Sequence, residues 1–290
     1  MYQPPYIKSK AVLNRFFRKS GLLFLLGLAS SASAQVVNFD IQINYTGAAQ
    51  FESAFTDAEA RWEAIIGSYI DGKQGAATFG PLVINASMEP IAGPGNVLGS
   101  AGPNFIAQDD SGYVLTTEGS MRFDSEDLTV NNLFLQNVVM HEMGHVIGIG
   151  TLWELNNLYD PAAPAVIDPL TGESVGQYLG PEALAAYRAE FDPAALYVPI
   201  EKGGGGGTAN GHWDEIDGGG NTGRISLITG EDMTNEVMTG WANGSLFVSN
   251  LTRGGVRDLG YNAELLPVPE PTGTLLLGVG SLCLLARRRR

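Results

Sequence analysis

The run His141-Glu142-Met143-Gly144-His145-Val146-Ile147-Gly148 contains two of the three histidines in this 290-residue chain. In a helix, residues four positions apart share one face, so the imidazoles of His141 and His145 are expected to point at one metal ion. Glu142 lies on an adjacent part of that face, within reach of a water on the ion. His212 stands 67 residues after His145. With His212 as third ligand, the site would use every histidine of the protein.

These residues fit the requirements of a catalytic zinc site, which needs three protein ligands and one open position. Histidine nitrogen suits zinc, and a bound Zn²⁺ lowers the pKa of its water to about 7 and polarises a carbonyl. Glu142 would take a proton from that water and pass it to the leaving amine. The motif therefore predicts a metallopeptidase. The alternative is a non-enzyme with structural histidines.

The residues before the motif predict strands and a helix. Apolar and polar residues alternate over 37–45, which is typical of a half-buried strand. Apolar residues recur at helical spacing from Phe51 to Tyr69, which predicts an amphipathic helix of about 20 residues. Further strands are expected at 82–88 and 120–123. Residues 92–119 are rich in Gly, Pro and Asp and are expected to form a loop.

The motif itself is expected on a helix from Asn132 to Ile147, with Gly148 ending it in a left-handed conformation. The following residues are interrupted by prolines such as Pro161, Pro164, Pro169, Pro181 and Pro193, so only a short helix at 181–190 is expected before residue 203. Five consecutive glycines, Gly203 to Gly207, then lead to His212. Such a run has little conformational preference and predicts a mobile insertion or a lid.

Both ends of the chain have the composition of processing signals. Residues 1–34 combine a basic start, a short apolar run from Gly21 to Ala29 and the small residues Ala32-Ser33-Ala34, which is the layout of a secretory signal peptide. A membrane anchor is the alternative for this segment. At the other end, Pro269-Glu270-Pro271 precedes an apolar stretch, 272–286, and four terminal arginines.

This C-terminal arrangement, residues 266–290, resembles the bacterial PEP-CTERM sorting signal. The resemblance implies an exosortase-type processing enzyme as a partner, transient anchoring in the inner membrane through a transmembrane segment at 272–286, and release to the cell surface or extracellular matrix of a Gram-negative-type bacterium. A plain C-terminal anchor is the alternative. The membrane is expected to be a partner only through this tail, before processing.

Charge and cysteine content narrow the function further. Residues 35–271 have 8 basic and 31 acidic residues, a net charge of −23, so nucleic acid is not an expected partner. Some of these carboxylates could bind a structural Ca²⁺, but no EF-hand loop supports this. The only cysteine, Cys283, lies in the tail, so the exported domain has no disulfide.

The motif together with three later segments resembles the metzincin zinc peptidases. In their common pattern the third histidine stands three residues after the glycine, where this chain has Thr151. The leishmanolysin-like branch inserts a long segment instead, as here, where 63 residues separate Gly148 from His212. The later segments that match are Gly211-His212-Trp213-Asp214-Glu215, Asn235-Glu236-Val237-Met238-Thr239-Gly240 and Asp258-Leu259-Gly260-Tyr261.

The resemblance implies an α+β metzincin-like fold over residues 35–265. An N-terminal subdomain (35–150) would contain a twisted mixed β-sheet and the active-site helix, and a C-terminal subdomain (151–265) would supply a Met-turn. Met238 would be the structural floor beneath one catalytic Zn²⁺ bound by His141, His145 and His212. Trp213 is expected to pack beside His212 and fix its ring, and Glu215 is either a partner of the site or a solvated acid.

The expected function is that of an exported zinc-dependent endopeptidase with Glu142 as general base and protein or peptide substrates. One rival keeps the activity and replaces His212 with a later glutamate, Glu154 or Glu182, as in the gluzincins. The other is a catalytically inactive surface or extracellular-matrix protein with the same fold.

Overall fold

The computed structural model describes residues 36–91, 93, 95, 97–128, 133–241 and 246–269. The predicted signal peptide, the predicted membrane segment at 272–286 and Asn132 lie outside these residues. The described part has several β-sheets and four α-helices in a mixed α+β arrangement, which confirms the predicted fold class at that level. The predicted domain boundaries stay predictions.

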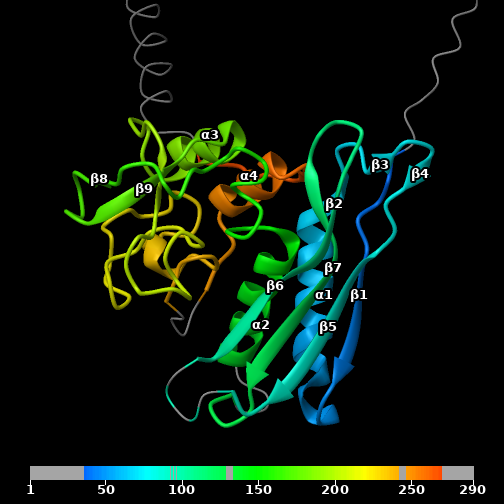
Figure 1. Cartoon of the computed structure of the whole chain (residues 1–290). Coiled ribbons are helices and arrows are strands. Elements are labelled where there is room, and N and C mark those ends of the chain that lie inside the picture. Colours follow the sequence, from blue (N-terminus) through cyan, green and yellow to red (C-terminus); the bar gives the residue numbers. More distant parts are fainter. Residues whose placement is uncertain are drawn as a thin grey trace, which may run out of the picture. The chain divides into compact units, whose positions relative to one another are not determined.

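The largest sheet has four strands in the spatial order β1-β5-β7-β6 (Figure 1). Strands β1, β5 and β7 are parallel, and β6 pairs antiparallel with β7 at the edge. Alternate residues of β5 are buried, which shows that one face of the sheet is covered. The four strands in chain order are β1 (Ile41–Thr46), β5 (Leu82–Glu89), β6 (Gly99–Gln108) and β7 (Val114–Asp124).

Two helices cover that face, α1 (Glu52–Ile65) and α2 (Leu133–Ile147). Helix α2 packs on β6 and β7, and α1 packs on β1 and on α2. The fully buried Trp62 of α1 donates from its indole N–H to the Met140 carbonyl at 3.0 Å and so joins the two helices. A Cβ on Gly119 of β7 would lie 2.4 Å from Val146, so only glycine there lets α2 approach this closely.

The predicted first strand and helix are both too long. Val37 and Phe39 are buried, but their backbones pair with β2 (Ile66–Tyr69). Pairing with the main sheet begins only at Ile41. Helix α1 ends at Ile65, because the next residues form β2 and pair with β11 (Tyr261–Ala263). The apolar residues continue past the helix end because Ile66 and Tyr69 are buried in β2 as well.

The predicted loop at 92–119 is wrong, because this segment contains β6 and the first part of β7. Strand β6 is an edge strand in which no residue is fully buried, so it shows no alternating apolar pattern. An edge strand also tolerates proline, and the pairing with β7 is irregular between Pro103 and Phe105. The predicted strand at 120–123 lies inside the longer β7.

The remaining elements are short, and the predicted helix at 181–190 is confirmed as α3. Its first N–H groups, from Glu182 and Ala183, donate to the Asp258 carboxylate at 2.9 Å each, so a residue of α4 caps α3. These elements are η1 (Ala49–Phe51), β3 (Lys73–Gln74), β4 (Ala77–Thr78), β8 (Val166–Ile167), β9 (Ser174–Tyr178), α3 (Pro181–Glu190), β10 (Val198–Ile200), η2 (Met233–Asn235) and α4 (Asn250–Asp258).

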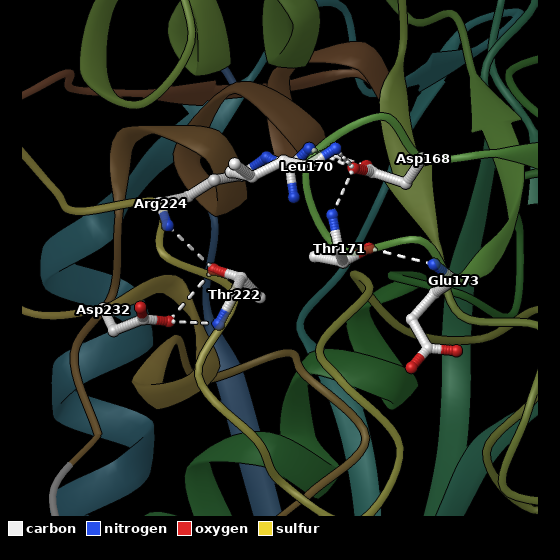
Figure 2. Close-up of polar contacts among 7 residues, drawn as sticks. All are labelled: Asp168, Leu170, Thr171, Glu173, Thr222, Arg224 and Asp232. Carbon is white, nitrogen blue, oxygen red and sulfur yellow. Dashed lines mark hydrogen bonds and ion pairs between the residues drawn. The ribbon is translucent and has the colours of Figure 1, made fainter.

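A buried ion pair joins distant parts of this loop-rich region, which has no cysteine. Figure 2 shows Arg224 reaching Asp168, at 2.8 and 2.6 Å from the two carboxylate oxygens. Burial opposes ionisation of Asp168, but hydrogen bonds from Arg224 and from the N–H groups of Leu170 and Thr171 outweigh it and lower its pKa. The charge is therefore compensated, as a buried carboxylate requires.

Candidate metal centre

The three histidine side chains converge on one point. The Nε2 atoms of His141 and His145 are 3.1 Å apart, and His212 Nε2 lies 3.1 Å from the first and 3.0 Å from the second. An ion about 2.0–2.1 Å from each nitrogen, the usual zinc–nitrogen distance, fits a triangle of this size. Among the described residues, this is the one group of His, Cys, Asp and Glu side chains close enough to hold a metal ion.

The other nitrogen of each ring faces a backbone carbonyl. The Nδ1 atoms of His141, His145 and His212 lie 2.7, 2.9 and 2.7 Å from the carbonyl oxygens of Val237, Ile149 and Thr208. A carbonyl oxygen only accepts, so each Nδ1 has the proton and each neutral ring directs its Nε2 lone pair to the centre. The sequence alone does not identify these three acceptors.

Burial keeps the rings neutral. It lowers the pKa of His141 to about 3, with repulsion from His145 adding to the effect. Burial likewise lowers the pKa of His145, and burial with repulsion from both other histidines lowers that of His212. A metal ligand must be deprotonated, so the three side chains are in the form that binds an ion at neutral pH.

The end of α2 brings His212 to the pair. The helix stops after Ile147, and Gly148 follows with a positive φ of 130°, as predicted. Thr151, at the position of the common third histidine, donates to the His145 carbonyl at 2.6 Å and so satisfies a free carbonyl at the helix end. Gly150 then lies against the backbone of Gly211, just before His212. The approach is so close that a Cβ on Gly150 would lie 2.1 Å from the Gly211 oxygen.

We expect Gly150→Ala to weaken zinc binding at least tenfold, since the close approach to Gly211 would have to open and take His212 with it. The new side chain also meets a φ of 77°, which costs an L residue about 1–2 kcal/mol. Gly172→Ala is the matched control, because Gly172 has a φ of 78° and open space around its Cβ position. Competition with a chromophoric chelator measures the affinity, and equal losses in both variants would contradict this role.

Met238 lies against the helix between the two ligating positions. It is fully buried, and a Cβ on Gly144 would lie 2.5 Å from its sulfur. Its backbone carbonyl accepts from the N–H of Trp213 at 3.0 Å, which places the residue after His212 beside it. The importance of Gly144 was not evident from the sequence, where it is only one of the two variable positions of the motif.

Trp213 and Glu215 do not hold the His212 ring. The Trp213 indole packs on Trp153 and donates to Thr252 at 2.9 Å, whereas Thr208 holds the ring. Glu215 is buried and accepts from the Gly240 N–H at 3.0 Å, so it is not a solvated acid. Within the described ranges, no hydrogen bond joins it to a histidine.

Glu142 faces a cleft with a volume of about 750 Å³ that also contains the three histidines. Its side chain is 8% exposed, and burial raises its pKa to about 8. A cation among the histidines would oppose this shift and favour the ionised form. A Cβ on Gly99, the first residue of β6, would lie 3.1 Å from the Glu142 Cγ, so glycine leaves this carboxylate room.

The glutamates of the gluzincin alternative are not in the cluster. Glu154 lines a second, smaller hollow, which His145 and His212 line as well. Glu182 pairs with Arg257 at 3.1 Å. The glycine run lines both hollows, and Thr208 next to it donates to the Gly205 carbonyl in a turn, so the insertion positions the His212 acceptor.

The geometry defines an α+β protein in which three converging histidines and Glu142 line one cleft. Residues 267–290 match the family model of the PEP-CTERM protein-sorting motif. This motif implies recognition by an exosortase-type processing enzyme, and it indicates an exported protein that is transiently anchored through its C-terminal tail. A comparison with curated proteins finds no match to the chain. Within the described ranges, every helix is too short or too polar to cross a membrane.

Proposed function

We propose that this protein is an exported zinc-dependent endopeptidase of the leishmanolysin-like metzincin type. The observation that carries the proposal is the convergence of three Nε2 atoms within 3.1 Å while all three Nδ1 atoms face carbonyls. No proton remains to make a hydrogen bond between the Nε2 atoms, so three lone pairs repel one another. A cation at their centre turns this repulsion into binding.

His141, His145 and His212 would hold the ion, and Zn²⁺ suits a site of three histidine nitrogens. When bound, zinc supplies a Lewis acid that activates water and polarises a peptide carbonyl. Glu142 holds the general-base position, since its carboxylate is on the same cleft wall and, within the described residues, no hydrogen bond restrains it. It would accept the proton of the attacking water and deliver it to the leaving amine.

The cleft also offers a place for an extended peptide. Strand β6 pairs with β7 on one side only, among the described strands, and its first residues line the cleft. An edge strand with free N–H and C=O groups can add a further strand through backbone hydrogen bonds. We place the substrate backbone along β6, with its scissile carbonyl beside the histidines. Met238 would form the floor of the site.

A combined metal and cleavage measurement tests the proposal. The purified exported protein is expected to contain about one zinc ion per chain and to cleave peptides from a mixed library. Treatment with 1,10-phenanthroline should abolish cleavage, and added zinc should restore it. Cleavage that survives complete metal removal would refute the mechanism. Bound zinc without any cleavage would favour the alternative function, a catalytically inactive surface or extracellular-matrix protein. The sorting tail is compatible with that alternative.

A further inference from the structure

Residues 264–266, close to the end of the described chain, are held on α4 by two side chains. Asn250 is 2% exposed, and its Nδ2 donates to the Leu266 carbonyl at 2.8 Å while its Oδ1 accepts from the Leu266 N–H at 2.7 Å. Arg253, one turn further along the helix, donates from Nη1 to the Glu264 carbonyl at 2.8 Å. We call Asn250, Arg253 and residues 264–266 the clamp, because these bonds fix the chain on the helix.

The helix that carries the clamp is itself built into the fold. Helix α4 packs on α3 and on β11 (Figure 1). The Ser249 hydroxyl oxygen accepts from the Thr252 N–H and caps the helix. The Asn250 N–H donates to the buried Glu190 carboxylate of α3 at 2.7 Å. Strand β11 pairs with β2, so the chain also enters the clamp from a paired strand. The position of Leu266 is therefore fixed relative to the core of the domain.

The sorting signal starts at the residue after the clamp. The match to the PEP-CTERM protein-sorting motif begins at residue 267. The apolar stretch of the tail begins at Thr272, so only residues 267–271 separate it from Leu266. Six residues span at most about 22 Å, because each advances an extended chain by no more than about 3.6 Å. While the tail anchors the protein, the clamp therefore lies within about 22 Å of the apolar stretch.

This short spacer brings the processing enzyme against the folded domain. The exosortase-type enzyme recognises a motif that includes Pro269-Glu270-Pro271, which ends five residues after Leu266. A globular domain of only 100 residues has a radius of gyration of about 13 Å and is roughly 30 Å wide, which exceeds the reach of the spacer. The enzyme must also surround the chain with the walls of a cleft. An enzyme on the motif therefore meets the surface around the clamp.

That surface suits an apolar contact with a protein. Leu265 and Leu266 follow one another and are each 36% exposed. On the same helix Arg257 pairs with Glu182 at 3.1 Å, so its charge is compensated nearby. Side chains on a backbone that is already fixed lose less conformational freedom when a partner covers them, which favours binding.

We propose that the clamp presents Leu265 and Leu266 as a docking surface for the exosortase-type processing enzyme, which packs against this side of α4 while it acts on the tail. The surface belongs to the folded domain and not to the sorting motif. Asn250 and Arg253 are positioning residues that hold it. This inference depends on the sorting tail and is independent of whether the domain is a peptidase.

The test follows release of the full-length protein in a bacterium whose own exosortase-type enzyme processes proteins with this motif. Leu265→Glu places a charge on the surface, and pulse-chase labelling measures conversion of the anchored form into the shorter released form. We expect release to slow about five- to tenfold, because covering an unpaired charge is unfavourable. Leu170→Glu makes the same change at another exposed leucine and should keep the rate within about twofold.

A longer spacer separates docking from other defects. Roughly ten Gly and Ser residues inserted between Leu266 and Pro267 more than double the maximal reach, so the enzyme no longer has to touch the domain. In this background Leu265→Glu should be released as fast as the unsubstituted protein. A normal rate for Leu265→Glu with the natural spacer would overturn the proposal. So would an equal delay with both spacers, because the defect would then lie in export or folding.

Asn250→Asp tests the clamp itself. Aspartate cannot donate to the Leu266 carbonyl, yet a negative charge suits the first turn of a helix. Hydrogen exchange of residues 264–269 should become faster, and the Leu265→Glu delay should shrink to within about twofold, because the freed residues lengthen the spacer. Asn44→Asp, at an exposed position of β1, should change neither measurement. Faster exchange with an undiminished delay would show that the enzyme reads Leu265 as part of a linear motif, and would overturn the docking surface.

Discussion

Glu142→Gln is expected to lower kcat/KM for peptide cleavage by about 10²–10⁴-fold, the contribution that a positioned general base usually makes. The amide has the size of the carboxylate but cannot accept the proton of the attacking water. Zinc content should stay unchanged, because the three imidazoles and their carbonyl partners are untouched. Cleavage assays at equal zinc occupancy provide the measurement.

Glu154→Gln is the matched control for this variant. It makes the same chemical change in an exposed side chain that lines the second hollow beside His145. Its kcat/KM is expected to stay within about twofold of that of the native protein, since surface substitutions change little. If both variants cleave as fast as the native protein, Glu142 is not the base. If both lose activity equally, the loss follows from removing a negative charge near the site, and Glu142 has no special role as proton acceptor.

Local patterns were sufficient to predict the elements that lie close to the histidine pair. Helix α2 follows from its apolar positions, and its end follows from Gly148, whose positive φ suits glycine. Strand β5 and helix α3 were found in the same way. In these segments the residues that contact the core are near one another in sequence, so their spacing reports the conformation directly.

Segments whose conformation depends on distant partners were not predicted. Strand β6 exists because β7 pairs with it, and its Gly-rich, exposed sequence shows no period. Residues 66–69 form a strand and do not continue the helix, because they pair with Tyr261–Ala263, a segment almost 200 positions later in the chain. The approach of Gly150 to Gly211 likewise becomes visible only when both segments are in place. A close approach of two distant segments leaves no spacing pattern in a sequence.

The same limit applied to His212, which the sequence assigned to the site only by elimination and by a family resemblance. Its position depends on the Glu201 N–H, which donates to the His212 carbonyl at 3.1 Å, and on the Thr208 carbonyl, which holds its ring. His212→Ala is expected to reduce zinc affinity by at least 100-fold, because two histidines cannot complete a three-ligand site. Zinc analysis after dialysis against a weak chelator measures this loss.

Thermal unfolding gives a second, independent measure of the His212→Ala effect. An ion that binds only the folded state stabilises it by about 4 kcal/mol at a concentration 1,000-fold above Kd. Chelation should therefore lower the Tm of the native protein but leave the Tm of His212→Ala unchanged.

Glu154→Gln and Glu182→Gln should keep both the zinc and the chelator-sensitive Tm. The opposite pattern, with zinc retained in His212→Ala and lost in one glutamate variant, would move the third ligand to that glutamate. The metal would then have to draw the glutamate toward α2, away from the hollow of Glu154 or the Arg257 pair of Glu182.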